Sequence, residues 1–280
     1  MISINSATPP KYNQCTQTVK NTSNNVYFCG KNKTCPPTNT SLKLALGEDN
    51  LTILDKIRMI GKANGKETYL FGGAVRDCLL GKKPHDLDII VNGDAIEFAK
   101  ELNSQDKKTF SGTFLKPSVK RAIVYTKEMD MDIVPLCSDG NSATTKDEIR
   151  AALIKKARTS DFTVNSMIIK LDEDKNGELK LKLIDKLGAK KDLRENLLKS
   201  LNAEEFERNP VLALRGKRYQ LRYGMKTDNN THKLIKESII HPKCKGNPLR
   251  VAKELYKLAI ETKNPLTIIR YLSNYKLFKK

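Results

Sequence analysis

The spacing of apolar residues along the middle of the chain changes between two periods. A helical period, with an apolar residue every three or four positions, predicts helices at 51–60, 74–80 and 95–102, the first of them capped by Asn50. Short apolar runs predict strands at 68–71, 87–91, 109–115, 121–126 and 129–136. This mixture predicts an α+β fold with a small, mixed and largely antiparallel sheet.

From Asp147 onward the period is mostly helical, apart from a lone strand-like pair around the turn DEDKNG. We therefore predict an α+β domain over residues 48–197 and an all-helical domain over residues 198–280. Residues 1–47 contain no Asp or Glu and are rich in Asn, Thr, Ser, Lys and Pro. Such a segment buries too little apolar surface to offset its ordering entropy, so it is predicted to be a disordered basic leader. An RNA-contacting arm is the alternative.

Composition narrows the class of protein. The 280 residues are 39 % hydrophobic and 30 % charged, which is typical of a globular protein and excludes a fully disordered or collagen-like chain. No stretch approaches the ~20 apolar residues of a membrane helix. Lys and Arg number 51 against 32 Asp and Glu, a net charge of +19 that favours polyanionic partners such as RNA or nucleotides. A Lys-rich proteome would produce the same excess without such a partner.

The cysteines and histidines predict no zinc site. None of the six cysteines forms a CxxC pair, and the three histidines do not complete a zinc pattern. No N-terminal segment has the basic start and apolar core of a secretory signal. The sequence therefore predicts reduced thiols and a cytoplasmic protein.

The most informative stretch is LFGGAVRDCLLGKKPHDLDIIV, residues 70–91. Gly72 and Gly73 stand between a predicted strand and a predicted helix, where a backbone without Cβ atoms can approach a phosphate closely. Asp86 and Asp88 are two apart on the next predicted strand, so both side chains should leave the same face. Two carboxylates beside a phosphate cradle predict a site for Mg²⁺, and a third would allow two metal ions.

The combination is more specific than its parts. A Gly-Gly turn alone is common, and two acids on one strand more often face solvent. Here GG, RD, LLG and DLD follow one another within residues 72–88. This order resembles the first motif of the class II template-independent nucleotidyltransferases, the family of bacterial tRNA CCA-adding enzymes and poly(A) polymerases. The resemblance extends from about residue 51 to the end and implies a nucleotidyltransferase head followed by a helical neck.

The resemblance also implies a catalytic metal site. Asp86 and Asp88 match the two metal-binding carboxylates of the family's first motif. Asp132, in the segment MDIVPL, is similar to the third carboxylate on a later strand, and Asp130 on the same face is the alternative. The arginine that follows this strand in the family is absent, because Cys137 stands in its place.

Seven residues are implied to bind the nucleotide: Gly72, Gly73, Arg76, Asp161, Asn165, Arg215 and Arg218. Gly72, Gly73 and Arg76 would form the triphosphate cradle. Asp161 and Asn165 lie in TSDFTVN, which is similar to the ribose-contacting motif RRDFTxN with both arginines replaced.

The base-selecting motif is the largest departure. The family's EDPxRxLR aligns with RNPVLALR, so Arg208 and Asn209 replace its two acids and Leu212 replaces the arginine that reads the base. Only Arg215 is retained. Because the chain ends at Lys280, we also expect no further domains to grip a tRNA.

Three functions remain open. The resemblance implies an RNA nucleotidyltransferase with a two-metal mechanism in which the metal is Mg²⁺. Such an enzyme would transfer a nucleoside monophosphate from ATP or CTP to the 3′ end of an RNA, with tRNA as one such acceptor. The loss of the base-reading residues favours a diverged binding module that holds RNA or nucleotide without turnover. A nucleotidyltransferase with a non-RNA acceptor is the third. The three carboxylates favour the first, since a binding module has no need of them.

Overall fold

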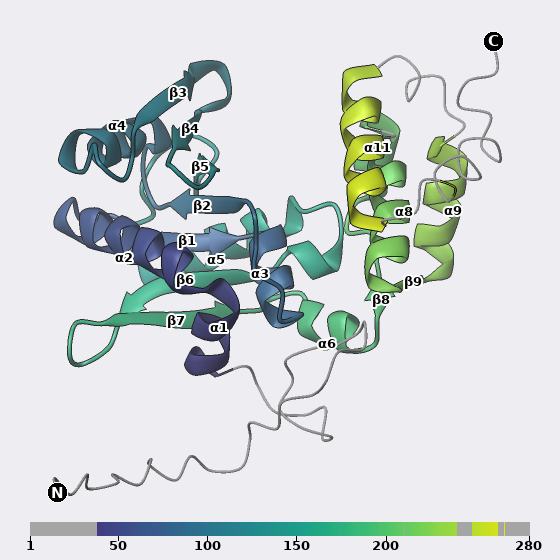
Figure 1. Cartoon of the computed structure of the whole chain (residues 1–280), viewed down its shortest axis with the longest axis horizontal. Helices are drawn as coiled ribbons and strands as arrows, with labels where there is room; N and C mark the ends of the chain where they lie inside the picture. Colours follow the sequence, from purple (N-terminus) through teal and green to yellow (C-terminus); the bar gives the residue numbers. More distant parts are fainter. Residues whose placement is uncertain (1–37, 210, 240–247, 263–265, 267–280) are drawn as a thin grey trace, which may run out of the picture.

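The computed structural model describes residues 38–209, 211–239, 248–262 and 266 (Figure 1). The helical elements of the head are α1 (Asn39–Leu46), α2 (Glu48–Ala63), α3 (Gly73–Leu79), α4 (Ala95–Gln105), the 3-10 turn η1 (Pro117–Val119), α5 (Lys146–Arg158), the 3-10 turn η2 (Thr163–Asn165) and α6 (Ala189–Arg194). Its strands are β1 (Thr68–Phe71), β2 (Leu87–Val91), β3 (Gly112–Lys116), β4 (Arg121–Tyr125), β5 (Asp130–Pro135), β6 (Ile168–Glu173) and β7 (Leu179–Ile184).

The remaining described elements form the neck. They are β8 (Leu197–Leu198), α7 (Ala203–Arg208), α8 (Val211–Tyr223), β9 (Lys226–Thr227), α9 (Asn229–Ile239) and α11 (Pro248–Thr262). Helix α8 packs against both α9 and α11. The neck is helical as predicted, although the two short strands β8 and β9 pair in parallel.

Seven strands form one sheet in the order β3-β4-β5-β2-β1-β6-β7. Every neighbouring pair is antiparallel except β2 and β5, which run parallel with Asp88 opposite Asp132. The predicted α+β class with a mixed, largely antiparallel sheet is therefore confirmed. The strand-like pair around DEDKNG is not isolated, because β6 pairs with β1 and β7 with β6.

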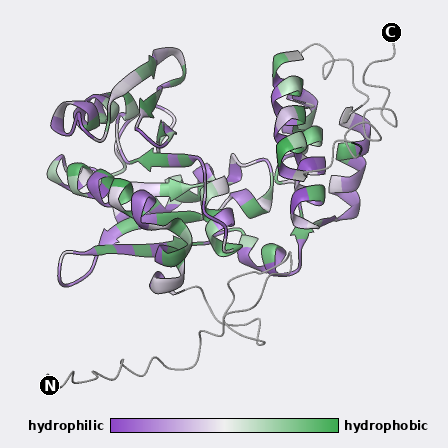
Figure 2. Ribbon diagram, in the orientation of Figure 1, coloured by the Kyte–Doolittle hydropathy of each residue, from purple (hydrophilic) through white to green (hydrophobic). Residues whose placement is uncertain are grey.

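Side-chain alternation along the strands gives the sheet two different faces. Leu70 and Ile89 point into the larger core, which also contains residues of α1, α2, α3 and α4. Tyr69 and Ile90 point to the other face, where they pack against Leu153 and Ala157 of α5. Figure 2 shows the hydrophobic residues along the central strands and hydrophilic ones on the outer loops and helix surfaces. The sheet is thus covered on both faces.

Two predictions about the start of the head are wrong. Within the predicted leader, α1 is an ordered helix with a capping box at Thr38 and Ser41. Its Leu42 and Leu46 are 2 % and 0 % exposed, so this part of the leader belongs to the core. Residues 1–37 lie outside the described structure. Asn50 is not an N-cap, because α2 begins two residues earlier, and its buried amide donates to the Leu46 carbonyl.

Gly61 allows α2 to lie close to the start of β1. A Cβ at this position would meet Thr68 Cγ2 at 2.8 Å and the Lys66 carbonyl oxygen at 2.9 Å. The Gly61→Ala variant should therefore lose about 1–3 kcal/mol of stability, although alanine favours a helix by about 1 kcal/mol. Thermal unfolding measures the loss. Met59→Ala, at an exposed position of the same helix, should change stability by no more than about 0.5 kcal/mol, and equal melting temperatures for the two variants would contradict the close packing.

Candidate active site

The turn between β1 and α3 brings backbone next to a carboxylate. Gly72 has φ 76° and ψ −137°, a conformation that side chains disfavour. A Cβ there would also lie 3.2 Å from Asp88 Oδ2. Both constraints favour glycine at position 72. Gly73 is the first residue of α3.

Two of the three predicted metal-binding carboxylates lie side by side. Asp88 on β2 is opposite Asp132 on β5, and both have the same strand parity as Ile90, so they point to the α5 face. Burial, followed by the charges of Asp132 and Asp86, raises the pKa of Asp88 to about 6. Two carboxylates this close together form a negatively charged pair that a cation would stabilise.

Asp86 lies one residue before β2, so strand alternation does not fix its direction as the sequence predicted. Its carboxylate is largely exposed and lies 3.8 Å from the Lys257 ammonium on α11. Among the described residues, no three His, Cys, Asp or Glu side chains are gathered as a ready-made metal site. Asp86 would have to turn away from Lys257 to complete one with Asp88 and Asp132.

Asp132 has an unsatisfied oxygen. Its Oδ1 is buried and accepts no hydrogen bond from the described residues, although Arg121 Nη2 lies 3.0 Å away. The guanidinium of Arg121 and the carboxylate of Asp132 thus form an ion pair that lacks hydrogen-bond geometry. Arg121 Nε is also buried and has no hydrogen-bond partner among the described residues. A buried carboxylate oxygen without a donor fits a site for a hard cation. Asp130, the alternative third carboxylate, is exposed at the start of β5.

A second group joins most of the predicted nucleotide-binding residues to the neck. It forms a closed ring of hydrogen bonds and ion pairs: Arg76, Asn165, Asp161, Arg215, Glu254, Arg218, Glu261, Arg222 and Asp77. We call this set the arginine ring. Its members come from α3 and the η2 region of the head and from α8 and α11 of the neck.

Arg76 is the most enclosed member of the arginine ring, with a side chain that is only 4 % exposed. Its guanidinium donates to Asp77 Oδ1, Asn165 Oδ1 and Tyr223 Oη. It also stacks on the rings of Tyr219 and Tyr223 at 4.6 and 4.9 Å. The structure thus places this arginine between head and neck, with its donors directed at protein groups.

The Asn165 side-chain amide donates a hydrogen bond of 2.7 Å to Asp161 Oδ1. Asp161 Oδ2 also accepts from Arg215 Nη1 at 2.8 Å. Arg215 is 37 % exposed, whereas Arg218 is 6 % exposed and is held by Glu254 and a second glutamate. Arg215 is therefore the more open of the two predicted arginines.

The sequence analysis did not identify the two glutamates of the neck that belong to the arginine ring. Glu254 and Glu261 on α11 hold three arginines of α8. Their separation of seven residues places them on one helical face, and Arg218 and Arg222 are four apart on α8. These two spacings were the available signal.

Of the base-reading positions, the one aligned with the reading arginine of the family carries no polar group. Leu212 is 6 % exposed and belongs to the hydrophobic core. Arg208 is 69 % exposed and pairs with Glu204 and Glu205 of its own helix. Pro210, on which the alignment rests, lies outside the described residues.

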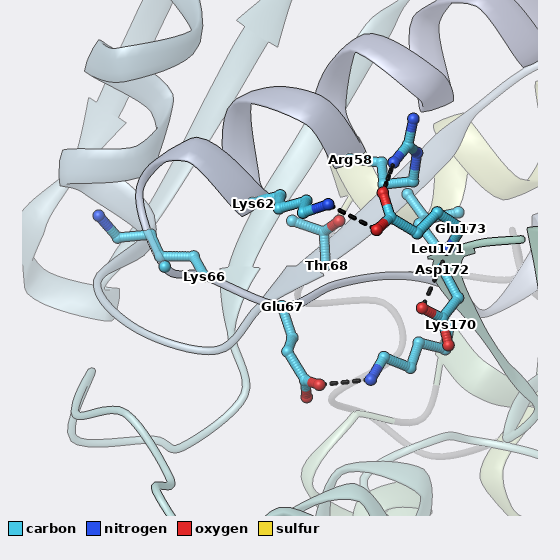
Figure 3. Close-up of a pocket in the computed structure, with 10 residues that line it drawn as sticks. Arg58, Lys62, Lys66, Glu67, Thr68, Lys170, Leu171, Asp172 and Glu173 are labelled. Carbon is cyan, nitrogen blue, oxygen red and sulfur yellow. Dashed lines mark hydrogen bonds and ion pairs between the residues drawn. The ribbon is translucent and has the colours of Figure 1, made fainter. Parts of the chain in front are cut away.

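A cavity of about 280 Å³ lies at the other end of β1, near the end of α2 (Figure 3). Arg58 and Lys62 pair with Glu173, and Lys170 pairs with Glu67. Because the lining cations are already neutralised, the cavity offers no clear site for an anion. No helix within the described ranges is both long and apolar enough to cross a membrane.

The sequence of the chain is similar to that of known proteins. Residues 68–199 match the model of the poly(A) polymerase head domain. An A-adding tRNA nucleotidyltransferase of Aquifex aeolicus is 31 % identical over 76 % of this chain and 25 % of the relative. A second A-adding enzyme, from Halalkalibacterium halodurans, is 27 % identical over 78 % of this chain and 51 % of the relative.

The fold is also similar to solved structures. The Thermotoga maritima CCA-adding enzyme complexed with tRNA superposes with a TM-score of 0.67 and 27 % identity, over 86 % of this chain and 54 % of that one. The chain thus spans between a quarter and about half the length of these curated and solved relatives.

Proposed function

Residues 68–199 belong to the poly(A) polymerase head-domain family, and from that premise we propose that the chain is an RNA nucleotidyltransferase. It would transfer a nucleoside monophosphate from an NTP to an RNA 3′ end. The supporting observation is the facing pair Asp88 and Asp132 beside the Gly72 backbone. The proposal assigns the chemistry to residues 48–197 and RNA or nucleotide contacts to residues 198–280.

Members of this family are metal-dependent, and we assign the metal as Mg²⁺ held by Asp86, Asp88 and Asp132. The unsatisfied Asp132 oxygen and the raised pKa of Asp88 support this assignment. Bound there, Mg²⁺ would activate the attacking hydroxyl and neutralise charge on the leaving pyrophosphate. Asp86 would give up Lys257 to take part.

The chain's own residues would position the nucleotide. Gly72 and Gly73 let the backbone approach the triphosphate, since neither carries a Cβ. Asp161 and Asn165 would orient the ribose hydroxyls, and Arg215, with its partly exposed guanidinium, would contact the nucleotide directly.

Arg76 and Arg218 have a different proposed part. They are almost fully buried, so they would act by holding Asn165 and Glu254 in place.

The substrates and location follow from the same premise. Similar enzymes have been solved with tRNA, with CTP and with ATP. We assign ATP or CTP as the donor and an RNA 3′ end, tRNA among them, as the acceptor. The unpaired thiols of Cys78 and Cys137 support a reducing, cytoplasmic location.

The direct test incubates the purified chain with RNA, Mg²⁺ and each labelled NTP in turn. We expect labelled RNA that is lost when the metal is chelated. A protein that binds RNA or nucleotide but extends no 3′ end would favour the binding-module alternative, for which the loss of a reader at Leu212 is the supporting observation.

Nucleotide choice should be loose. A site built to hydrogen-bond a base discriminates strongly because the wrong base leaves buried polar groups unpaired. Leu212 can donate nothing and lies in the core, so this chain should prefer one nucleotide weakly or add several without order. Sequencing RNA 3′ ends after reaction with all four NTPs checks this. Clean CCA ends on a tRNA that lacks them would show that other residues read the base.

A further inference from the structure

Lys156 is a half-buried lysine that has no ion pair with a described carboxylate. It lies near the end of α5, on the face of the sheet that also carries Asp88 and Asp132. Its ammonium donates to the Pro135 carbonyl at 2.9 Å. Burial, followed by the charge of Arg121, lowers the pKa of Lys156 to about 8. A half-buried ammonium without an acidic partner is costly unless an anion joins it.

Arg121 approaches the same region from β4. Ala122 and Val124 point into the larger core, so Arg121 and Ile123 point to the α5 face. Its Nη2 lies 3.0 Å from Asp132 Oδ1, and its side chain is 41 % exposed. Its Nε makes no hydrogen bond with the described residues. Arg121 therefore places a partly exposed cationic side chain beside the predicted catalytic carboxylate.

The two cations also stand close to positions where the family resemblance expects arginines. Cys137 follows β5, two residues after Pro135, whose carbonyl accepts the hydrogen bond from Lys156. Thr159 and Ser160 follow Lys156 by three and four residues, which is one helical turn. Lys156 is thus close, along the chain or in space, to three positions that lack the expected charge.

We propose that Lys156 and Arg121 form a phosphate-binding pair beside Asp132. The inference rests on the proposed function, because it takes the anion to be a phosphate of one of the two substrates. A lysine supplies a point charge and an arginine a planar set of donors, and both suit phosphate oxygens. The phosphate belongs either to the RNA backbone near the 3′ end or to the triphosphate of the nucleotide.

The test substitutes Lys156 and compares it with its neighbour. Lys156→Gln removes the charge, and Lys155→Gln makes the same change at an exposed position of the same helix. Lys156→Arg restores the charge. The affinity of each full-length variant is measured for an RNA oligonucleotide without nucleotide, and for ATP with Mg²⁺ but without RNA. The salt concentration is varied in the RNA series.

We expect Lys156→Gln to weaken one of the two affinities by about tenfold, with recovery in Lys156→Arg and little change in Lys155→Gln. A phosphate of the RNA would also reduce the slope of log affinity against log salt by about 0.7. A phosphate of the nucleotide would leave RNA affinity and its salt slope unchanged. Equal losses in the two Gln variants, or none in either, would overturn the proposal.

Two further controls separate a lost phosphate contact from a loss of protein stability and from a loss of catalytic activity. Removing an unpaired half-buried charge should leave the melting temperature of Lys156→Gln at or above that of the unchanged protein, and Lys156→Met provides a second neutral side chain if it does not. Because both affinities are measured without turnover, they decide the proposal even if the chain extends no RNA. In that case the proposed function is wrong, and the two affinities still show whether Lys156 and Arg121 bind a phosphate.

Discussion

Replacing Asp88 with asparagine is expected to abolish nucleotidyl transfer and leave the fold intact. The carboxylate lies against the Gly72 turn and opposite Asp132, where the proposed metal would bind. Losing one carboxylate removes both activation of the hydroxyl and stabilisation of the leaving group. We expect a loss of at least about 10³-fold, corresponding to about 4 kcal/mol of barrier.

The same substitution should not destabilise the protein when divalent ions are chelated. Burial and two neighbouring acids raise the pKa of Asp88 from 3.8 to about 6. The folded state therefore holds this proton more tightly than the unfolded chain, and stability falls as pH rises through about 6. At pH 8 Asp88→Asn removes this penalty, so its melting temperature should equal or exceed that of the unchanged protein.

Asp130→Asn is the matched control for catalysis. Asp130 is also a strand carboxylate but is exposed at the start of β5, so its loss should reduce transfer by less than about threefold. Transfer by Asp88→Asn within tenfold of the unchanged rate would contradict the metal assignment. A severe loss in Asp130→Asn, with Asp132→Asn unaffected, would move the third carboxylate to Asp130.

Replacing Arg76 with methionine should produce the largest loss of stability. The substitution removes one buried partner each from Asp77 and Asn165 and takes the cation away from the rings of Tyr219 and Tyr223. Breaking a buried charge network from one side costs about 3–5 kcal/mol. At about 2–4 °C for each kcal/mol in a chain of this size, the melting temperature should fall by about 6–20 °C.

Arg208→Met is the control for Arg76, since Arg208 is 69 % exposed and its ion pairs are local. Its effect should not exceed about 0.5 kcal/mol. Equal effects of the two variants would show that the arginine ring contributes little. Arg76→Lys tests the triphosphate cradle: full stability combined with weaker ATP binding would return Arg76 to direct phosphate contact.

The sequence was sufficient where local spacing determines structure. The apolar run from Leu87 to Val91 predicts β2. Alternate side chains of a strand point to opposite faces, so a strand covered on both faces is apolar along most of its length. The glycines at 72 and 73 predict a tight turn, and at Gly72 a side chain would be strained and would meet Asp88. These local features belong to the first motif, and the succession of its residues along the chain was enough to suggest the family.

Tertiary structure decided the features that depend on distant residues. Half of the residues of helix α1 are polar, and its packing against α2, α3 and β7 makes Leu42 and Leu46 core residues. The register that sets Asp88 opposite Asp132 joins parallel strands separated by α4, β3 and β4.

The arginine ring and the Lys156–Arg121 pair also depend on tertiary structure. Arg76 meets Asn165 across 89 positions, and Arg215 meets Glu254 across 39. Sequence periodicity describes how one element presents its faces, whereas long-range packing determines which faces meet. The residue types for this site were therefore readable in the sequence, but their pairing was fixed only when the head and neck folded against each other.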